Sequence, residues 1–333
     1  MCPRDGSPVA NRPGQVTDLH AAAQPSAPTV SAYNWCAIVV TWQPDLNNLS
    51  DLMRTLVEQG CAVRVIDNGS DNAAALQEMC AGIGIMHDRA PATVDLWGRN
   101  QGLAHALNAG LEYARDHGYS HALLFDQDSR VGAGFCQSMA EAWQQAQHHC
   151  RQPVAALGPR LQDPDTARQT PFRKFRLLHR SDHPVAGTTG LYDTDFLITS
   201  GTLLSLAALE HIGLMKDDYF IDNIDLEWCF RARAQGYALC GTDHAVLYHR
   251  IGETSRNPLV RAGIMVSHSP LRSYYSTRNR LHLRRQSYAP RDWRWRDSVR
   301  FALKSLWLVL FTGQRRRYFS EIRRGIRDAR DIT

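Results

Sequence analysis

Two aspartates spaced i, i+2 stand near the middle of this 333-residue chain. Residues 123–125 predict the end of a buried strand, and Asp126 and Asp128 follow it directly. Carboxylates at this spacing can bind one divalent cation together, and a cation held by only two carboxylates keeps open positions that suit a diphosphate. Because Asp and Ser are turn residues, a surface turn that ends at Ser129 is the alternative interpretation. The pair predicts a metal–diphosphate site or a turn.

A second acidic cluster lies about one hundred residues further on. Asp222, Asp225 and Glu227 precede or open a predicted helix over residues 224–235, which Gly236 closes. A carboxylate beside a substrate hydroxyl can take its proton, so the cluster could supply a general base. Acidic residues are also favourable at the start of any helix, which leaves a capping role equally open.

Two further segments could contact a nucleotide. Asp67 ends a predicted strand over residues 62–66, and its carboxylate could accept from a base imide or a ribose hydroxyl, or simply form an Asx turn. The segment 99–110 opens a helix whose first N–H groups suit a phosphate, or are capped by Asn100. Because this segment is neither a Walker P-loop nor a GxGxxG motif, kinase and dinucleotide-binding functions lose support.

His249 follows the last predicted strand, over residues 245–248. It could be a third metal ligand, although lone histidines are more often structural.

Strands and helices alternate from Trp35 onward. The predicted strands are 36–41, 62–66, 123–125 and 196–199, and the predicted helices between them are 46–59 and 102–117. Such alternation predicts an α/β fold with a mostly parallel, Rossmann-like sheet and helices on both faces. Thr41, Asp67 and Asp126 each fall at a strand's carboxyl end, where ligands bind in open sheets of this kind.

The composition is that of a globular protein, with 44% hydrophobic and 21% charged residues. Eight cysteines without a CxxC pair indicate buried thiols and argue against a disulfide framework or a zinc site. Residues 1–33 predict a disordered leader and lack the continuous apolar run of a secretion signal.

Basic residues are concentrated in residues 284–333, which predict helix. The apolar stretch 298–312 is shorter than the roughly 18 to 20 residues of a membrane span, so it predicts either an interfacial helix or a helix packed on the core. The arginines also raise a nucleic-acid-binding function, but that function gives no reason for acidic clusters at strand ends.

Eight short segments, in this order, resemble the family 2 glycosyltransferases of the GT-A fold, and more narrowly bacterial rhamnosyltransferases. The similarity is closest to the enzymes that add the second rhamnose in rhamnolipid synthesis. The segments are residues 39–44, 65–70, 100–104, 124–130, 199–201, 219–227, 249–252 and 270–279. The resemblance implies a GT-A domain over residues 34–283, between the leader 1–33 and a basic amphipathic helical tail over 284–333.

The resemblance also implies a role for each candidate residue, with dTDP-L-rhamnose as the donor. Thr41 and Asp67 would hold the thymine and ribose of the donor, and Arg99, Asn100 and Gly102 would lie near its nucleotide and phosphates. Asp126 and Asp128 match the family's DxD motif, which binds Mg²⁺ or Mn²⁺. His249 matches a position that often completes the metal site. Asp225 would be the general base, and Glu227 lies two residues after it. Asp222 is the second choice, because the family's acidic pair is shifted here and Ile224 stands where many members have Glu.

The implied reaction is an inverting single displacement onto the hydroxyl of an amphiphilic glycolipid. Mono-rhamnolipid is the expected acceptor, and a lipid-linked O-antigen oligosaccharide is the alternative. The expected location is the cytoplasm, with peripheral contact to the inner membrane. No nucleic-acid partner is expected, and a homo-oligomer is allowed.

Overall fold

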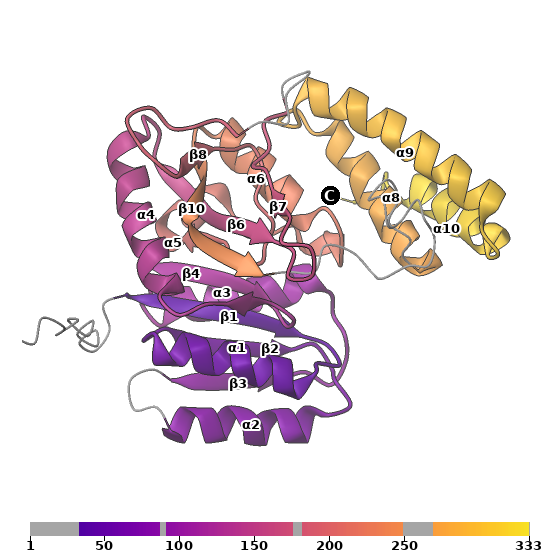
Figure 1. Ribbon diagram of the computed structural model, residues 1–333. Helices are drawn as coiled ribbons and strands as arrows, with labels where there is room; N and C mark the ends of the chain where they lie inside the picture. Colours follow the sequence, from indigo (N-terminus) through magenta and orange to yellow (C-terminus); the bar gives the residue numbers. More distant parts are fainter. Residues whose placement is uncertain (1–32, 87–90, 176–181, 249–268, 333) are drawn as a thin grey trace, which may run out of the picture.

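The computed structural model describes residues 33–86, 91–175, 182–248 and 269–332. The strands are β1 (Trp35–Thr41), β2 (Ala62–Asp67), β3 (Ala92–Leu96), β4 (His121–Asp126), β5 (Arg130–Val131), β6 (Val154–Gln162), β7 (Gln169–Thr170), β8 (Leu191–Asp193), β9 (Leu203–Ser205) and β10 (Ala238–Tyr248). The helices are α1 (Leu46–Glu58), α2 (Ala73–Met86), α3 (Leu103–Asp116), α4 (Phe135–His149), α5 (Leu206–Ile212), α6 (Ile224–Ala234), α8 (Pro270–Arg285), α9 (Arg291–Phe311) and α10 (Arg315–Asp328), with a 3₁₀ turn η1 at Asp217–Tyr219. Figure 1 shows their arrangement.

The described strands form one sheet in the order β3-β2-β1-β4-β9-β6-β10-β5, with β7 and β8 paired at its side. The longer pairings β3–β2, β2–β1, β1–β4 and β6–β10 are parallel. The short strand β9 runs antiparallel between β4 and β6. The predicted α/β fold with a mostly parallel sheet is therefore confirmed.

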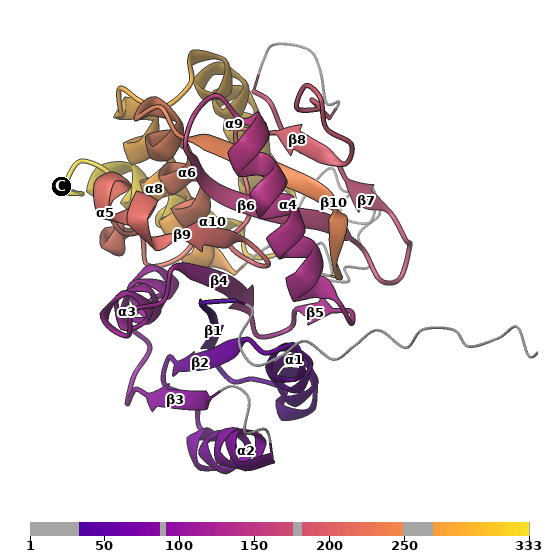
Figure 2. The same ribbon diagram turned by 90° about the vertical axis from the view of Figure 1, so that its left-hand side faces the viewer.

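Alternate residues of β1 face two separate helical layers, as the two-residue period of a strand requires. Ala37 and Val39 join the core beneath α1, α2 and α4, whereas Cys36 and Ile38 join the core beneath α3, α5 and α6. Figure 2 shows α1 and α4 on one side of the sheet and α3 and α5 on the other. Helix α3 can approach β1 closely because Gly110 has no side chain. A Cβ at this position would lie 2.3 Å from the Ile38 side chain.

Helices α8, α9 and α10 form a bundle beside α6, drawn in orange to yellow in Figure 1. Phe230 of α6, Leu283 of α8 and Trp293 of α9 share a small core. Helix α10 lies against α8, where the Tyr274 hydroxyl donates to Asp328 at 3.1 Å. The domain boundary expected after residue 283 falls near the end of α8, and residues 1–32 lie outside the described part.

The predicted strand over residues 196–199 is wrong. Phe196 forms only an isolated bridge with Arg173, and the strand in this region is β9. Gly201 explains the shift, because its φ of +77° turns the chain before β9 begins and a Cβ there would meet Pro159 at 2.7 Å.

Within the described ranges, no helix has the length and apolar character needed to cross a membrane. The seven described cysteines are all free, and six of them are buried.

Candidate active site

Three of the predicted site residues meet at one edge of the sheet. Thr41 ends β1 and pairs in register with Asp67 at the end of β2. On the other side of β1, Val40 pairs with Asp126 at the end of β4. Parallel pairing thus brings residues from distant parts of the sequence to the carboxyl edge, where open α/β sheets bind ligands.

The Asp67 carboxylate is fully buried and organises the turn after β2. It accepts from the Thr41 hydroxyl at 2.8 Å, from the Ser70 N–H at 2.8 Å and from the Ser70 hydroxyl at 2.5 Å. Thr41 is also fully buried. Both residues therefore form the floor of this edge, and they hold residues 68–70 above it.

The turn after β2 contacts the loop that leads into α3. The Asn68 side-chain oxygen accepts from the Gln101 N–H at 2.7 Å, and Asn100 accepts from the Gly102 N–H at 2.9 Å. Arg99 and Asn100 are exposed, whereas Gly102 is buried.

Gly102 joins this loop to the second acidic cluster. It has φ of +99°, and a Cβ there would lie 2.7 Å from the Phe220 ring. The next residue, Leu103, donates its N–H to the Phe220 carbonyl at 2.6 Å. A side chain at position 102 would therefore push residues 219–223 away from the sheet edge.

The turn after β4 is braced by two serines. The Asp126 N–H donates to the Ser200 hydroxyl at 3.3 Å, and the buried Ser129 and Ser200 hydroxyls lie 2.5 Å apart. Ser129 also donates its N–H to the Asp126 carbonyl at 3.1 Å, so residues 126–129 do form a turn. The turn leaves Asp126 half-buried and Asp128 exposed, which remains compatible with a cation site.

Residues 219–223, here called the acid loop, have an unusual backbone. Phe220, Asp222 and Asn223 have φ of 41°, 69° and 62°, the left-handed region that non-glycine residues rarely adopt. Such conformations cost on the order of 1–3 kcal/mol each and persist only where the surroundings impose them.

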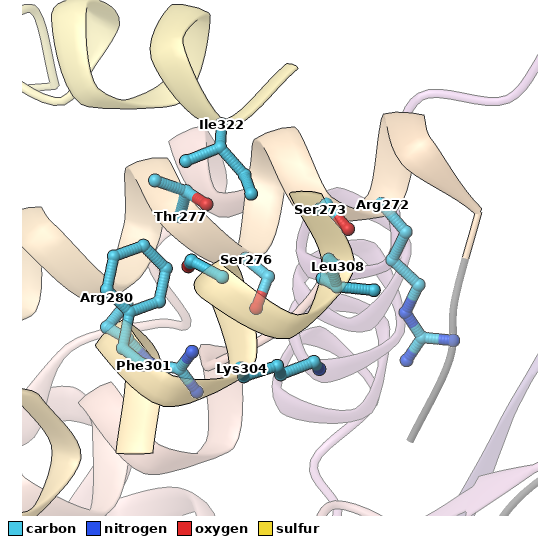
Figure 3. A pocket seen from close by; sticks show the side chains of 10 residues that line it. Arg272, Ser273, Ser276, Thr277, Arg280, Phe301, Lys304, Leu308 and Ile322 are labelled. Atoms are coloured by element: carbon cyan, nitrogen blue, oxygen red, sulfur yellow. The ribbon is translucent and has the colours of Figure 1, made fainter. Parts of the chain in front are cut away.

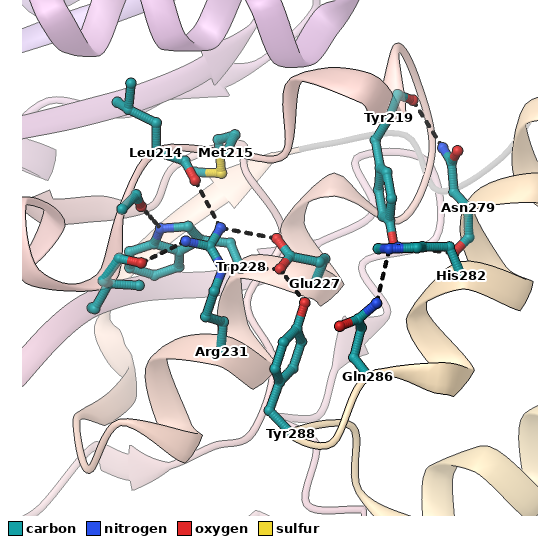
Figure 4. A network of polar contacts seen from close by, with 12 residues as sticks. Leu214, Met215, Tyr219, Glu227, Trp228, Arg231, Asn279, His282, Gln286 and Tyr288 are labelled. Carbon is teal, nitrogen blue, oxygen red and sulfur yellow. Dashed lines mark hydrogen bonds and ion pairs between the residues drawn. The ribbon is translucent and has the colours of Figure 1, made fainter. Parts of the chain in front are cut away.

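Asn279 of α8 imposes this conformation (Figure 4). It is fully buried, and its amide nitrogen donates to the carbonyls of Tyr219, Ile221 and Asp222 at 2.8, 2.8 and 2.9 Å. The Tyr219 hydroxyl donates back to the Asn279 carbonyl at 3.1 Å and lies 2.8 Å from Nδ1 of His282. The acid loop is thus held by a helix of the C-terminal bundle.

Two of the three predicted acids have an arginine partner. Asp222 accepts through Oδ1 from Nε and Nη2 of Arg272, at 3.0 and 2.9 Å. Glu227 is fully buried and accepts from Nε and Nη2 of Arg231 at 2.9 and 3.0 Å, and from the Tyr288 hydroxyl at 2.7 Å (Figure 4). These contacts tie α6 and the acid loop to their neighbours.

Asp225 differs, because its carboxyl is half-buried at the start of α6 and its pKa is raised to about 7. Removal from water is the largest cause of this raised pKa, and the negative charges of Asp126 and Asp222 add to it, while the Leu226 N–H opposes it. Asp225 therefore lies close enough to Asp126 for their charges to interact, so the fold brings the two acidic clusters together.

The described residues contain no group of three or more His, Cys, Asp or Glu side chains that could hold a metal by themselves. His249, the expected third ligand, lies outside the described residues.

Sequence patterns did not single out Asn279 and Arg272 as site residues. A signal existed for Asn279, since Asn279 and His282 are spaced i, i+3 on an otherwise basic helix and so share one face. Arg272 and Asp222 are 50 residues apart in sequence, and Asn279 and Tyr219 are 60 apart, so no local pattern reveals these pairs.

We expect Asn279→Asp to destabilise the protein by about 3 kcal/mol or more, because a carboxylate cannot donate to the three buried carbonyls and would repel them. Urea unfolding measures the change. Asn47→Asp is the matched control, since Asn47 is exposed in the first turn of α1, and we expect its effect to stay within about 0.5 kcal/mol. Equal stability of wild type and Asn279→Asp would contradict this role.

The Asp225 carboxyl should titrate near pH 7 in the metal-free protein, and Asp126→Asn should lower its pKa by removing a negative charge. Carbon-13 NMR of the Asp225 carboxyl measures both. Because the folded-state pKa exceeds the ordinary 3.8, the native state binds the extra proton and stability falls as pH rises from about 4 to about 7.

The Asp225→Asn variant should lose this dependence of stability on pH, and above pH 7 it should be more stable than wild type by about 1–3 kcal/mol. If the Asp225 carboxyl of the wild type titrated near pH 4, and wild type and Asp225→Asn were equally stable at pH 8, burial would not raise the pKa of Asp225.

The sequence matches a known protein family and a named transferase. The sequence profile of glycosyl transferase family 2 matches residues 36–209. The dTDP-rhamnosyl transferase RfbF of Shigella flexneri is 31% identical over 260 residues, which cover 77% of this chain and 82% of RfbF.

Solved structures share the fold at low identity. S. aureus TarS 1–349 in complex with UDP-GlcNAc superposes with a TM-score of 0.55 at 13% identity, over 89% of this chain and 81% of that one. GalNAc-T7 with UDP, GalNAc and Mn²⁺ gives 0.54 at 12% identity, over 82% of this chain and 56% of that one. The chain covers 48% of the longer TarS structure.

These matches confirm the GT-A fold expected from the sequence. The profile match spans more than half of the chain, and the RfbF similarity extends over most of both proteins. The chain therefore belongs to glycosyl transferase family 2 and is a glycosyltransferase.

Proposed function

We propose that this enzyme transfers L-rhamnose from dTDP-L-rhamnose to a hydroxyl of a rhamnose-bearing glycolipid, with inversion at the anomeric carbon. The observation that carries the proposal is the contact between the nucleotide edge and the acid loop, where the Leu103 N–H donates to the Phe220 carbonyl at 2.6 Å and Asp225 follows in the first turn of α6. The name of the RfbF relative supports the donor, and the TarS and GalNAc-T7 structures support a nucleotide-linked sugar.

The nucleoside of the donor would lie over the turn after β2. Thr41 and Asp67 are buried, so they would act by fixing that turn under the base and ribose. Arg99 and Asn100 are exposed beside the turn, where they could reach the nucleotide, and Gly102 keeps this loop against the acid loop.

The donor set at this edge fits a hard divalent cation, because carboxylate oxygens are the ligands that Mg²⁺ and Mn²⁺ prefer. Asp126 and Asp128 would hold it, with His249 proposed as a third ligand. The mutual repulsion of Asp126, Asp222 and Asp225 also favours a positive charge here. When bound, such a cation neutralises negative charge on the leaving diphosphate.

Asp225 is the general base of the proposal. The acceptor oxygen forms its bond to the anomeric carbon as the bond from that carbon to the diphosphate breaks, and Asp225 takes the hydroxyl proton. A pKa near neutrality suits this role, because the group is then basic enough to accept a proton yet still ionised. Asp222, the second choice, is engaged by Arg272, and Glu227 by Arg231 and Tyr288. We propose that these two acids position Asp225.

Mono-rhamnolipid, which would become dirhamnolipid, is the first candidate acceptor. A lipid-linked O-antigen oligosaccharide fits equally well, since RfbF's name specifies a donor and no acceptor. Both are amphiphiles that present a sugar hydroxyl, and α9 has a surface that suits an amphiphile or the membrane that contains it.

One face of α9 is apolar and exposed. Trp295, Val299, Leu303, Leu306 and Leu310 are 69%, 43%, 60%, 56% and 52% exposed, at the spacing of three and four residues that places them on one side of a helix. The same helix and α10 also carry basic residues, including Arg291, Arg296, Arg300, Arg315 and Arg316. We propose that this apolar face binds the cytoplasmic surface of the inner membrane peripherally, since arginines attract anionic lipids.

We expect purified protein with Mg²⁺, dTDP-L-rhamnose and mono-rhamnolipid to form dirhamnolipid, detected by mass spectrometry. Asp225→Asn should lower kcat by about 10²–10⁴-fold, the usual contribution of a general base, with donor affinity preserved. Asp51→Asn is the control, because Asp51 is an exposed carboxylate on α1.

Transfer only to the lipid-linked oligosaccharide would favour the second acceptor. An Asp225→Asn variant with full activity would remove Asp225 as the base, and failure to bind dTDP-L-rhamnose would contradict the rhamnosyltransferase proposal itself.

The triple variant Leu303→Ser, Leu306→Ser, Leu310→Ser should bind anionic lipid vesicles at least about tenfold more weakly than wild type, because each buried leucine contributes roughly 1.5–3 kcal/mol. Vesicle co-sedimentation measures this partition. Ile85→Ser removes a 79% exposed apolar side chain from α2 and should leave binding unchanged. Equal partition of the triple variant and wild type would contradict the membrane proposal.

A further inference from the structure

A basic pocket lies between α8, α9 and α10 (Figure 3). Its empty space is about 310 Å³ when the open solvent at its mouth is included. Three cationic side chains and three serine hydroxyls line it: Arg272, Arg280, Lys304, Ser273, Ser276 and Ser305. None of these residues belongs to the nucleotide edge described above, and only Arg272 touches the acid loop.

Two of the three cationic side chains in the pocket form ion pairs with carboxylates. Arg272 pairs with Asp222 at 2.9 Å and Arg280 with Asp297 at 3.0 Å. Asp297 is shared, since it also accepts from Arg284 at 2.8 Å. Lys304 forms no ion pair with any carboxylate in the described part of the chain.

Lys304 is also poorly solvated. Burial lowers the pKa of its ammonium, and the nearby Arg280 and Arg272 lower it further, while Asp222 opposes them. An ammonium withdrawn from water without a partner costs free energy that a packed apolar side chain would not. A bound anion would supply the partner that Lys304 lacks among the described residues, and serine hydroxyls and guanidinium groups are suitable donors to its oxygens.

We infer that this pocket binds an oxyanion of the acceptor, an inference that rests on the proposed function. Mono-rhamnolipid would supply a carboxylate and a lipid-linked oligosaccharide a phosphate, and the same donors suit both. Two observations favour an amphiphile as the source of this oxyanion. Arg272 connects the pocket to Asp222 in the acid loop, and Lys304 and Ser305 lie between Leu303 and Leu306, which belong to the exposed apolar face of α9.

The first test uses simple anions and needs no transfer reaction. Isothermal titration calorimetry with inorganic phosphate and with acetate, on the full-length metal-free protein, should show phosphate binding to wild type and at least tenfold weaker binding to Lys304→Met. Because Lys304 has no carboxylate partner in the described part, its replacement should leave Tm unchanged or raised, which separates lost binding from unfolding.

Arg330→Met is the matched control, because it removes one exposed charge just after α10. It should leave phosphate affinity within twofold. Wild type that binds neither anion, or Lys304→Met that binds phosphate as tightly as wild type, would overturn the inference.

The second test identifies the source of the oxyanion with two pairs of acceptors. One pair is mono-rhamnolipid and its methyl ester, and the other is an oligosaccharide on a lipid diphosphate and on an uncharged lipid. In wild type the charged member of the true pair should have a KM at least tenfold below its neutral partner. In Lys304→Met this ratio should approach one, with the KM for dTDP-L-rhamnose unchanged.

The two proposals fail differently. Normal turnover with equal KM for charged and neutral acceptors would overturn the oxyanion pocket and leave the proposed function intact. No transfer to any of the four acceptors would contradict the proposed function. If the protein still bound phosphate in that case, the pocket would bind an anion that does not belong to these acceptors.

Discussion

The side-chain amide of Asn279 holds the acid loop in place, and the candidate site depends on it. Three residues of that loop adopt left-handed backbone conformations that would not persist alone. One buried amide donates to three of the loop's carbonyls and so offsets that strain. Since the amide belongs to α8, the C-terminal bundle is part of the site's construction.

Charge repulsion is the second constraint on this site. Asp126 and Asp222 each lie close enough to Asp225 to raise its pKa, although Asp126 is about one hundred residues away in sequence. The protein neutralises Asp222 with Arg272 and leaves Asp225 with a raised pKa. The ionised Asp225 carboxylate therefore destabilises the folded protein above neutral pH. Reactive groups in active sites often lower stability in this way. A cation with its diphosphate substrate would relieve the same repulsion.

Local sequence predicted those parts of the site that local physics determines. Thr41, Asp67 and Asp126 follow apolar runs and precede turn residues, so their positions at strand ends could be read directly. The pairing of Glu227 with Arg231 also has a local signature, the i, i+4 spacing on a helix. The apolar run over residues 196–199 misled the prediction, because strand formation needs a partner and the neighbouring strand position is taken by β9.

What the sequence could not reveal depends on side chains that meet across long separations. Asn279 reaches the acid loop and Arg272 reaches Asp222 only after the bundle has packed against α6. The position of Lys304 in the basic pocket likewise depends on the packing of α8 against α9. A basic helical tail is visible in the sequence, whereas its contribution to the site is a property of tertiary structure.

We propose that the carboxyl edge of the sheet and the acid loop form one active site for a nucleotide-linked sugar. The decisive experiment is a crystal structure with dTDP and Mn²⁺, in which anomalous scattering locates the cation. We expect Mn²⁺ to be bound by Asp126 and Asp128 together with the nucleotide's diphosphate, and Asp225 to face the same space. Nucleotide bound elsewhere, or an acid loop turned away from it, would contradict a single active site.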